Sequence, residues 1–334
     1  MKDALLRNLR DLRISVIDNC NFRCTYCMPA EIFGNSYRFL GGDELLSFDE
    51  IVAVARVCSE LGVEKIKSTG GEPLLRPFLH DLIRRLREIP GIQDVGLITN
   101  GFYLRKLASR LAAAGLNRVS VSLDSLDQDV FTQMAGRHAR VEQVLAAMDA
   151  AADAGLGPIK VNTVVQRGVN DDQVLSFVRH FGQRGYVSRF IEYMDVGNRN
   201  GRQRSHTVPS AELRERIGEH FTLTPLHANY GGEVATRYRV EELGSEIGFI
   251  SPVTEPFCGG CTRLRVPADG TLYTCLFSVR GTDLREHLRT GATDEDLTAT
   301  ISGVWKGRRD RYSEDRLNGR AHNQEKVEMN RMGG

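Results

Sequence analysis

The sequence lacks any long uninterrupted apolar run and carries almost no net charge. No stretch approaches the ~18 apolar residues that a membrane-spanning helix requires, so we expect no membrane partner. Residues 1–13 mix charges with leucines and do not form the apolar segment of a secretory signal peptide, so we expect a cytoplasmic protein. The formal net charge of +1 creates no overall field that would attract nucleic acid. An anionic ligand would need basic residues gathered locally around it.

The chain is also not expected to form disulfides, because thiols in the cytoplasm are kept reduced. Its seven cysteines therefore need another use, and six of them form two groups of three. The first trio has the spacing C-x3-C-x2-C and the second C-x2-C-x13-C: Cys20, Cys24 and Cys27, then Cys258, Cys261 and Cys275. Cys58 is left over in segment 49–61, whose apolar residues recur at helical spacing. We expect Cys58 to be a buried structural thiol.

Strand-like and helix-like segments alternate after the first trio begins. The strand segments are rich in β-branched and apolar residues, as strands covered on both faces should be: 12–17, 65–68, 94–98, 118–123, 159–165 and 188–193. Helical patterns lie between them, as at 76–88, 103–114, 141–154 and 171–183. Six successive βα units predict an α/β fold with a parallel sheet curled into a partial barrel.

We expect three regions along the chain. The barrel spans residues 1–220, and a smaller C-terminal region that contains the second trio spans 221–309. Residues 310–334 are strongly polar, which is typical of a solvated tail. The segment 196–210 is a polar loop that we expect to be mobile until a ligand orders it.

Polar motifs follow the strands of the predicted barrel. The first trio comes after the first strand, and Thr-Gly-Gly-Glu-Pro at 69–73 follows the second. Further polar residues end the next strands: residues 99–101, Ser122, Asp124, Asn162, Glu192 and Met194. Because active sites of barrel enzymes lie at the carboxyl ends of the strands, we expect these motifs to converge there.

Each cysteine trio predicts a metal site with one open position. Three thiolates that hold a four-iron cube leave one iron free for a ligand. For the first trio a cluster is favoured over zinc, because no fourth Cys or His is near. For the second trio the spacing alone fits zinc and a cluster equally. Arg263 and Arg265 follow Cys261 closely and indicate an anion placed against the metal, although both could instead face solvent.

The stretch Cys-Asn-Phe-Arg-Cys-Thr-Tyr-Cys at 20–27 resembles the signature of radical S-adenosylmethionine (SAM) enzymes, as does Gly-Gly-Glu-Pro at 70–73. The segments 13–15, 28–29, 43–48, 190–197 and 257–265, with the final glycine pair, resemble the GTP 3′,8-cyclase family of molybdenum cofactor biosynthesis. The resemblance extends over essentially the whole chain. It implies an incomplete (β/α)6 barrel with a smaller C-terminal region and a 4Fe–4S cluster at each end of the cavity.

The resemblance also implies a role for individual residues. The first trio would hold the cluster that binds SAM, and Tyr26, Gly71, Ser122 and Met194 would contact SAM. The second trio would hold a cluster that meets the guanine base. Positions that match the family's GTP contacts are Arg13, Lys67, Ile98, Lys160, Arg189, Arg263, Leu264 and Arg265. Arg263, Arg265 and the tail residues Gly333 and Gly334 match catalytic positions. Lys67 stands where the family commonly has arginine, and Ile98 where it can have threonine.

The implied reaction begins with a 5′-deoxyadenosyl radical derived from SAM. It removes hydrogen from ribose C3′ of GTP, and the carbon radical closes onto guanine C8. The implied partners are an external low-potential electron donor, a second copy in a homodimer, and the next enzyme of the pathway as product acceptor. Two rival interpretations remain: another radical SAM enzyme with an auxiliary cluster, such as a peptide-modifying one, and a metal-stabilised binding protein.

Overall fold

The computed structural model describes every residue except 138, 195, 198–203, 321–325 and 334. Part of the predicted loop 196–210 and Gly334 therefore lie outside the described residues. The main sheet has ten strands in the order β10-β1-β2-β3-β4-β5-β6-β9-β8-β7. The parallel strands are β10 (Arg263–Val266), β1 (Asp11–Ser15), β2 (Lys65–Thr69), β3 (Asp94–Thr99), β4 (Arg118–Ser122), β5 (Lys160–Val165), β6 (Val187–Glu192) and β9 (Ser245–Ile250).

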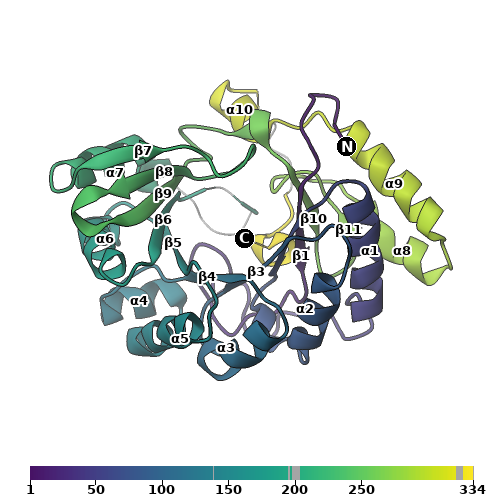
Figure 1. Cartoon of the computed structure of the whole chain (residues 1–334), viewed down its shortest axis with the longest axis horizontal. Coiled ribbons are helices and arrows are strands. Elements are labelled where there is room, and N and C mark those ends of the chain that lie inside the picture. Colours follow the sequence, from purple (N-terminus) through teal and green to yellow (C-terminus); the bar gives the residue numbers. More distant parts are fainter. Residues whose placement is uncertain (138, 195, 198–203, 321–325, 334) are drawn as a thin grey trace.

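Two antiparallel strands extend one edge of this sheet, and a short hairpin stands apart from it. They are β7 (Leu223–Leu226) and β8 (Thr236–Val240), then β11 (Thr271–Leu272) paired with β12 (Thr282–Asp283). Figure 1 shows the parallel strands arranged around a central opening with helices on the outside. The predicted α/β partial barrel is therefore confirmed. The predicted division at residues 220 and 309 stays a prediction, and strands from both sides of residue 220 share one sheet.

The structure describes eleven α-helices, and those that follow the barrel strands cover its outer face as the alternation predicts. They are α1 (Phe48–Glu60), α2 (Leu79–Arg87), α3 (Leu104–Ala113), α4 (Gln128–Ala135), α5 (Val141–Asp153), α6 (Val174–Gly182), α7 (Ser210–Gly218), α8 (Leu284–Arg289), α9 (Asp294–Lys306), α10 (Tyr312–Leu317) and α11 (Met329–Met332). Helix α2 begins three residues later than the pattern 76–88 predicts. Its start is delayed because Pro77 and Phe78 precede it, and Phe78 has a φ of 59°. None of the described helices is long and apolar enough to cross a membrane.

The hydrophobic core lies between the sheet and its outer helices. Strand residues such as Val119, Val121 and Val161 are fully buried there. Helix α1 begins with a capping box in which the Ser47 hydroxyl accepts from the backbone N–H of Glu50 at 3.1 Å. Cys58 on α1 has no exposed surface, as its helical spacing predicts. The core thus fixes the strands whose ends carry the polar motifs.

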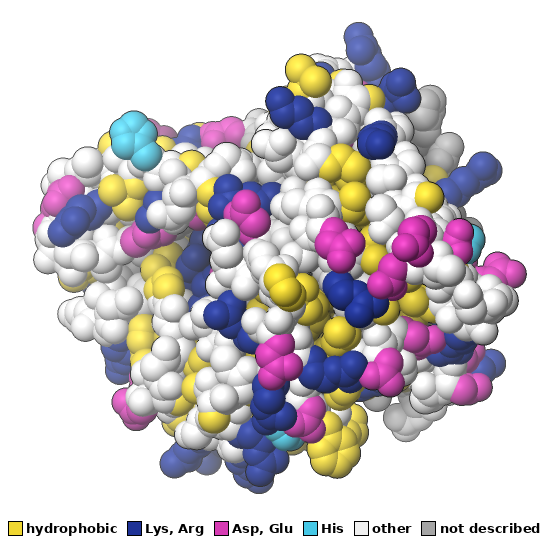
Figure 2. All heavy atoms as spheres, turned by 45° about the vertical axis from the view of Figure 1, so that its right-hand side comes forward, with side chains coloured by type: hydrophobic (Ala, Val, Ile, Leu, Met, Phe, Trp, Pro, Cys, Tyr) yellow, Lys and Arg dark blue, Asp and Glu magenta, His cyan; other side chains and the backbone are white. Residues whose placement is uncertain are grey.

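The outer face formed by α1, α2, α8 and α9 has charges of both signs. Figure 2 shows Lys and Arg interspersed with Asp and Glu on the side of the molecule that carries these helices. Arg56 of α1 pairs with Asp294 at the start of α9 at 2.7 Å, and Arg289 of α8 with Glu50 of α1 at 2.8 Å. These exposed pairs position the C-terminal helices against the barrel, although each contributes only up to about 1 kcal/mol.

Candidate active site

The two cysteine trios line the same cavity at the carboxyl ends of the strands. All six sulfur-bearing side chains are among its walls, together with residues from β1 to β6 and β10, and its volume is about 260 Å³. A second cavity of about 400 Å³ lies at the other end of the barrel, and both are lined by Arg13, Lys67, Arg189 and Arg263. The two cavities therefore share part of their walls; the first carries the thiols and the second most of the basic residues, and together they are called the passage below.

The first trio lies in the loop that follows β1. The backbone N–H of Phe22 donates to Cys20 Sγ at 3.3 Å, and that of Cys27 donates to the Cys24 carbonyl at 3.0 Å. Burial raises the pKa of Cys20 to about 11, and nearby Glu72 adds to the effect. Burial likewise raises the pKa of Cys24 and Cys27 above the ordinary value. Since thiols must ionise to bind iron, these cysteines need the positive charge of the metal itself.

The Gly-Gly-Glu-Pro motif packs directly against this loop. A Cβ on Gly70 would lie 2.3 Å from the Ile17 carbonyl oxygen, and one on Gly71 would lie 2.2 Å from that of Asn19. Only glycine allows the two loops to approach so closely. The buried Glu72 carboxylate accepts from the Thr99 hydroxyl and the Asn100 backbone N–H, both at 2.7 Å. Burial raises the pKa of Glu72 to about 7, although these hydrogen bonds lower it.

The residues predicted to contact SAM lie beside the first trio. Tyr26, Gly71, Ser122 and Met194 all line the cavity with it. The Tyr26 hydroxyl donates to Asp124 Oδ2 at 2.7 Å, and Asp124 Oδ1 accepts from the Val164 backbone N–H at 2.9 Å. Burial raises the pKa of Asp124 to about 6. This pair fixes the Tyr26 ring against the cavity wall.

The second trio is surrounded by arginines. Cys261 Sγ accepts from Arg263 Nη2 and from Arg308 Nη2, each at 3.2 Å. Burial alone would raise the pKa of Cys261, but the two guanidinium groups outweigh burial and lower it to about 6. Arg7 Nη1 donates to the Cys258 carbonyl at 3.1 Å. By contrast, burial raises the pKa of Cys275 to about 12. Arg263 therefore faces the site, as one of the two alternatives predicts.

Each trio offers three thiols to the same cavity. Among the described residues, no three His, Cys, Asp or Glu side chains gather closely enough to bind a single metal ion. Thiolates that each hold a different iron of a cube need not converge on one point. The cavity also offers polar atoms that lack partners within the described part of the chain, namely Asn162 Oδ1 and Arg189 Nε. Thiols and unsatisfied polar atoms together are suited to a cluster with a polar ligand.

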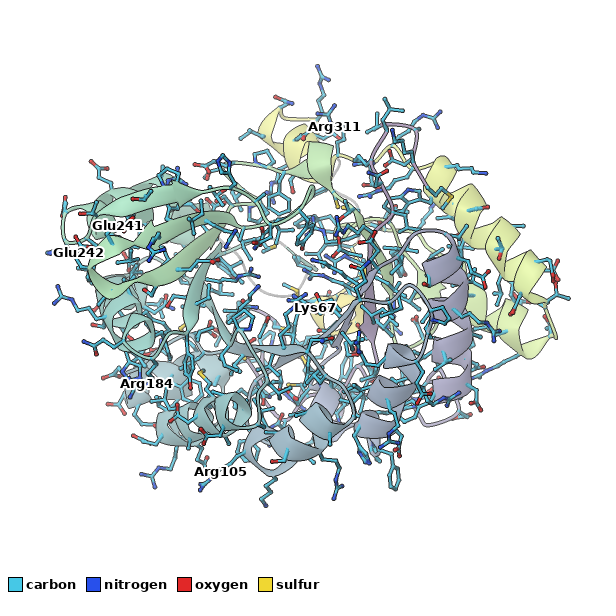
Figure 3. The ribbon with its side chains drawn as sticks, in the orientation of Figure 1. Lys67, Arg105, Arg184, Glu241, Glu242 and Arg311 are labelled. Atoms are coloured by element: carbon cyan, nitrogen blue, oxygen red, sulfur yellow. The ribbon has the colours of Figure 1, made fainter. Side chains whose placement is uncertain are left out.

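The strand register places basic residues of adjacent strands side by side. Arg13 on β1 is directly opposite Arg265 on β10 and Lys67 on β2. Lys160 on β5, Arg189 on β6 and Arg118 on β4 line the second cavity with Arg13 and Lys67. Figure 3 shows Lys67 at the centre of the ring of strands, whereas labelled Arg105 and Arg184 lie on the outside. The predicted basic positions are therefore brought together.

These cations are held close to one another at an electrostatic cost. Burial lowers the pKa of Lys67 well below the ordinary value, and Arg13 and Arg118 lower it further. Burial also lowers the pKa of Lys160 to about 7, with Arg189 contributing. The pKa of Arg13 falls to about 10 through burial and the charge of Arg263. Such a cluster favours a polyanion as its ligand.

Acidic and aromatic residues that the sequence did not single out complete the second cavity. The Glu233 side chain, only 4% exposed, lies 3.6 Å from Arg189 Nη2 and accepts from the Asn229 backbone N–H at 2.7 Å. Lys65 Nζ lies 3.4 Å from the centre of the Tyr230 ring. Arg118 Nε donates to Asp94 at 2.9 Å. Lys65, Asp94 and Arg118 each begin a predicted strand, whereas Tyr230 and Glu233 had no sequence signal.

Ile98 and Leu264, two predicted substrate positions, differ in what their side chains face. Ile98 lines the first cavity and offers an apolar contact, with Thr99 turned to Glu72. Leu264 is fully buried in the hydrophobic core. Because successive strand residues point to opposite faces, Leu264 can offer only backbone atoms on the face of Arg263 and Arg265.

The tail returns into the barrel. Figure 1 shows the last described residues, in yellow, inside the ring of strands. Asn330 and Met332 of α11 are 1% exposed, and Arg265 Nη1 donates to the Gly333 carbonyl at 3.0 Å. A Cβ on Gly333 would lie 2.3 Å from Thr69 Cγ2, so the backbone needs glycine there. Composition alone predicts a solvated tail, and the described end of the chain is instead buried.

Comparison with solved structures shows the same fold at low identity. A crystal structure of Streptococcus suis SuiB bound to S-adenosylmethionine matches 92% of this chain and 70% of its own, with a TM-score of 0.64 and 15% identity. SuiB bound to its precursor peptide SuiA gives a TM-score of 0.67 and 14% identity over 92% of this chain and 69% of its own.

Family models match most of the chain, and curated relatives match all of it. Residues 14–181 match the radical SAM superfamily, and residues 186–314 match Molybdenum Cofactor Synthesis C. GTP 3′,8-cyclase of Staphylococcus haemolyticus is 46% identical over 337 aligned positions, which cover 100% of this chain and 99% of that protein. The enzyme of the same name from Staphylococcus aureus is 45% identical with the same coverage. The chain belongs to the GTP 3′,8-cyclase family of the radical SAM superfamily.

Proposed function

We propose that this enzyme converts GTP into (8S)-3′,8-cyclo-7,8-dihydroguanosine 5′-triphosphate, the first step of molybdenum cofactor biosynthesis. The single observation that carries the proposal is the shared cavity. The three thiols of each trio line the first cavity, and at least five Lys and Arg side chains line the second. A nucleoside triphosphate has both the aromatic base and the polyanion that such a passage requires.

Membership of the radical SAM superfamily implies one 4Fe–4S cluster and SAM. Cys20, Cys24 and Cys27 would hold this cluster, and the combination supplies a 5′-deoxyadenosyl radical when bound. Tyr26, fixed by Asp124, would flank SAM. The backbone at Gly71 and the side chains of Ser122 and Met194 would complete the SAM site.

The second trio would hold a further 4Fe–4S cluster with one iron open to the guanine base. The low pKa of Cys261 supports this assignment, because a thiolate is the form that binds iron. Arg263, whose guanidinium group contacts the Cys261 sulfur, would also contact the base or ribose between the clusters. Arg265 would contact the nucleotide on one side and the Gly333 carbonyl on the other.

The triphosphate would occupy the cationic end of the barrel. A triphosphate carries about four negative charges, and guanidinium groups bind phosphate oxygens in pairs. Arg13, Lys67, Lys160 and Arg189 would supply these contacts, with Ile98 packed against the nucleoside. Lys67 binds as a point charge and lacks the fork of the arginine usual at this position.

The tail would close the passage and exclude water from the reacting atoms. Gly333 lies against β1 and β2 because its missing side chain leaves room beside Thr69 and Ser15. Exclusion of solvent would protect the carbon radical at ribose C3′ until its bond to guanine C8 has formed. Gly334, at the end of the same segment, would contribute to this closure.

The first experiment tests the reaction itself. The anaerobically reconstituted protein is mixed with SAM, a reductant and each ribonucleoside triphosphate in turn. We expect 5′-deoxyadenosine to form in step with a cyclised product from GTP alone. SAM cleavage that does not depend on GTP would overturn the specific activity and favour another radical SAM enzyme, such as a peptide-modifying one. Zinc in place of about eight irons per chain would overturn the cluster assignment.

The partners of the reaction follow from the same proposal. One electron from an external low-potential donor starts SAM cleavage. After C3′ bonds to C8, one further electron and a proton complete the 7,8-dihydro product. We further propose a cytoplasmic homodimer that delivers its product to the next enzyme of the pathway. Gel filtration of the reconstituted protein tests the dimer, and a monomer would overturn it.

A further inference from the structure

We propose that Arg308 is a positioning residue of the second cluster, which donates a charge-assisted hydrogen bond to the Cys261 thiolate and raises the reduction potential of that cluster. The inference rests on the proposed function, because it requires the second trio to hold iron. It assigns a role to a residue far from both cysteine motifs in the sequence. It predicts how the chain adjusts the electronic properties of its auxiliary centre.

Arg308 donates to two atoms of Cys261, the sulfur and the backbone carbonyl oxygen. Arg308 Nη2 lies 3.2 Å from Cys261 Sγ, and Arg308 Nη1 donates to the Cys261 carbonyl at 2.9 Å. The side chain of Arg308 is 1% exposed. Hydrogen bonds from charged donors are roughly twice as strong as neutral ones, and burial strengthens them further. These two contacts therefore orient the Cys261 side chain and stabilise the negative charge on its sulfur.

Other groups hold the guanidinium in this orientation. Asp310 Oδ1 accepts from Arg308 Nη2 at 3.0 Å and from Nε at 3.1 Å. The Trp305 ring lies beneath, with the guanidinium carbon 4.7 Å from its centre. Asp310 is itself held, because its other oxygen accepts from the Thr274 hydroxyl at 2.6 Å, next to Cys275. The end of α9 is thus connected to two of the three cluster ligands.

Arg308 differs from the other arginine on the same sulfur. Arg263 lies on a barrel strand and lines both cavities, whereas Arg308 lines only the first, so a nucleotide with its phosphates in the second cavity can draw Arg263 away from Cys261. Arg308 follows α9 and is fixed by Asp310 and Trp305 in the described structure. Its hydrogen bond should therefore persist whether or not GTP is bound. Hydrogen bonds to cluster sulfurs and nearby positive charge both raise the reduction potential.

The experiment isolates the second cluster in the full-length chain. Cys20, Cys24 and Cys27 are all replaced by Ala so that any remaining iron belongs to the second trio. In this background we compare Arg308→Gln, Arg308→Lys and the neighbouring control Arg309→Gln. Arg309 is exposed, and its Nη1 donates to the Gly307 carbonyl at 3.4 Å. The measurements are iron content, thermal melting and a redox titration followed by electron paramagnetic resonance.

We expect Arg308→Gln to lower the ratio of reduced to oxidised cluster about tenfold at a fixed potential, which is about 59 mV for a one-electron couple. Arg308→Lys keeps the charge but loses the fork, so its shift should be smaller and its resonance altered. Arg309→Gln should leave the midpoint unchanged. Loss of the cluster from both folded Arg308 variants would overturn the proposed effect on the potential, because Arg308 would then serve to hold the cluster.

Three outcomes separate this inference from the proposed function. If the background with Arg308 intact binds no cluster, the second cluster and with it the proposed function fail. If the cluster forms and either Arg308 variant keeps the parent midpoint and resonance, the inference is overturned and the function stands. If both variants fail to fold, Arg308 is a purely structural residue and the inference is likewise overturned.

Discussion

The affinity for GTP should fall steeply as the pH rises from 7 to 9, because Lys160 loses its proton in the empty enzyme. Burial lowers the pKa of Lys160 from the ordinary 10.5 to about 7, and the charges of Arg189 and Arg118 add to the shift. At about 1.4 kcal/mol per unit of pKa, the charged form is destabilised by up to roughly 5 kcal/mol. A triphosphate placed beside Lys160 removes much of this cost and returns the pKa toward its ordinary range.

The sign of the effect follows from the linkage between protons and folding. Below pH 7 Lys160 is charged in both the folded and the unfolded chain, so the folded state bears the whole cost. Above pH 7 the folded chain releases the proton and the cost is progressively relieved. Lys160→Met should therefore stabilise the empty protein most at pH 7 and below. GTP binding above pH 7 requires a proton to be taken up, so affinity falls up to tenfold per pH unit.

Calorimetric titration of the reconstituted enzyme with GTP, without reductant, measures both the affinity for GTP and the number of protons taken up. Runs in two buffers of different ionisation enthalpy count the protons taken up. Lys160→Met should bind GTP more weakly than the parent at pH 7, and the difference should narrow by up to about tenfold per pH unit toward pH 9. Lys106→Met, an exposed lysine on α3, is the control and should keep the parent profile. Equal parent affinity at pH 7 and 9 with no proton uptake would refute the reasoning.

Three further predictions use other parts of the passage. Cys258→Ser should lower the iron content from about eight to about four per chain, and 5′-deoxyadenosine should then form without cyclised GTP. Gly333→Ala should reduce product formation at least about tenfold with both clusters retained, because its Cβ meets Thr69 Cγ2 at 2.3 Å; unchanged turnover would count against the inserted tail. Glu233→Gln should move the pH dependence of GTP affinity to lower pH, since the carboxylate raises the pKa of Lys160; an unmoved profile would contradict this.

The barrel could be predicted from sequence because its signals are local. Each of the six predicted strands corresponds to one of β1 to β6 within a residue or two, and buried β-branched residues account for the agreement. Polar residues at strand ends predicted the site for a topological reason: the carboxyl ends of parallel strands meet on one side. The second trio could be joined to that site only through the family resemblance, because 230 residues separate Cys27 from Cys258.

The residues that the sequence missed act through contacts between distant segments. Glu233 is an ordinary acidic residue in a polar turn until β7 and β8 bring it to Arg189. Arg308 lies in a run of charged residues after α9, where exposure is the usual expectation, yet it reaches Cys261. Neither residue has a periodicity or a motif that would distinguish it. Such partners follow from tertiary packing, which a pattern along one chain does not specify.

The row formed by Arg265, Arg13 and Lys67 shows why the cavity and the fold must be understood together. Parallel strands lie about 4.8 Å apart, so the register places like charges on three adjacent strands at neighbouring positions. Like charges directly opposite one another destabilise a sheet, and burial increases the cost. A protein selected for stability alone would fill this row with apolar residues. The electrostatic cost is instead expressed in the lowered pKa values of Arg13 and Lys67. Under the proposed function, a triphosphate that enters would relieve this cost, and the relief would contribute to its affinity.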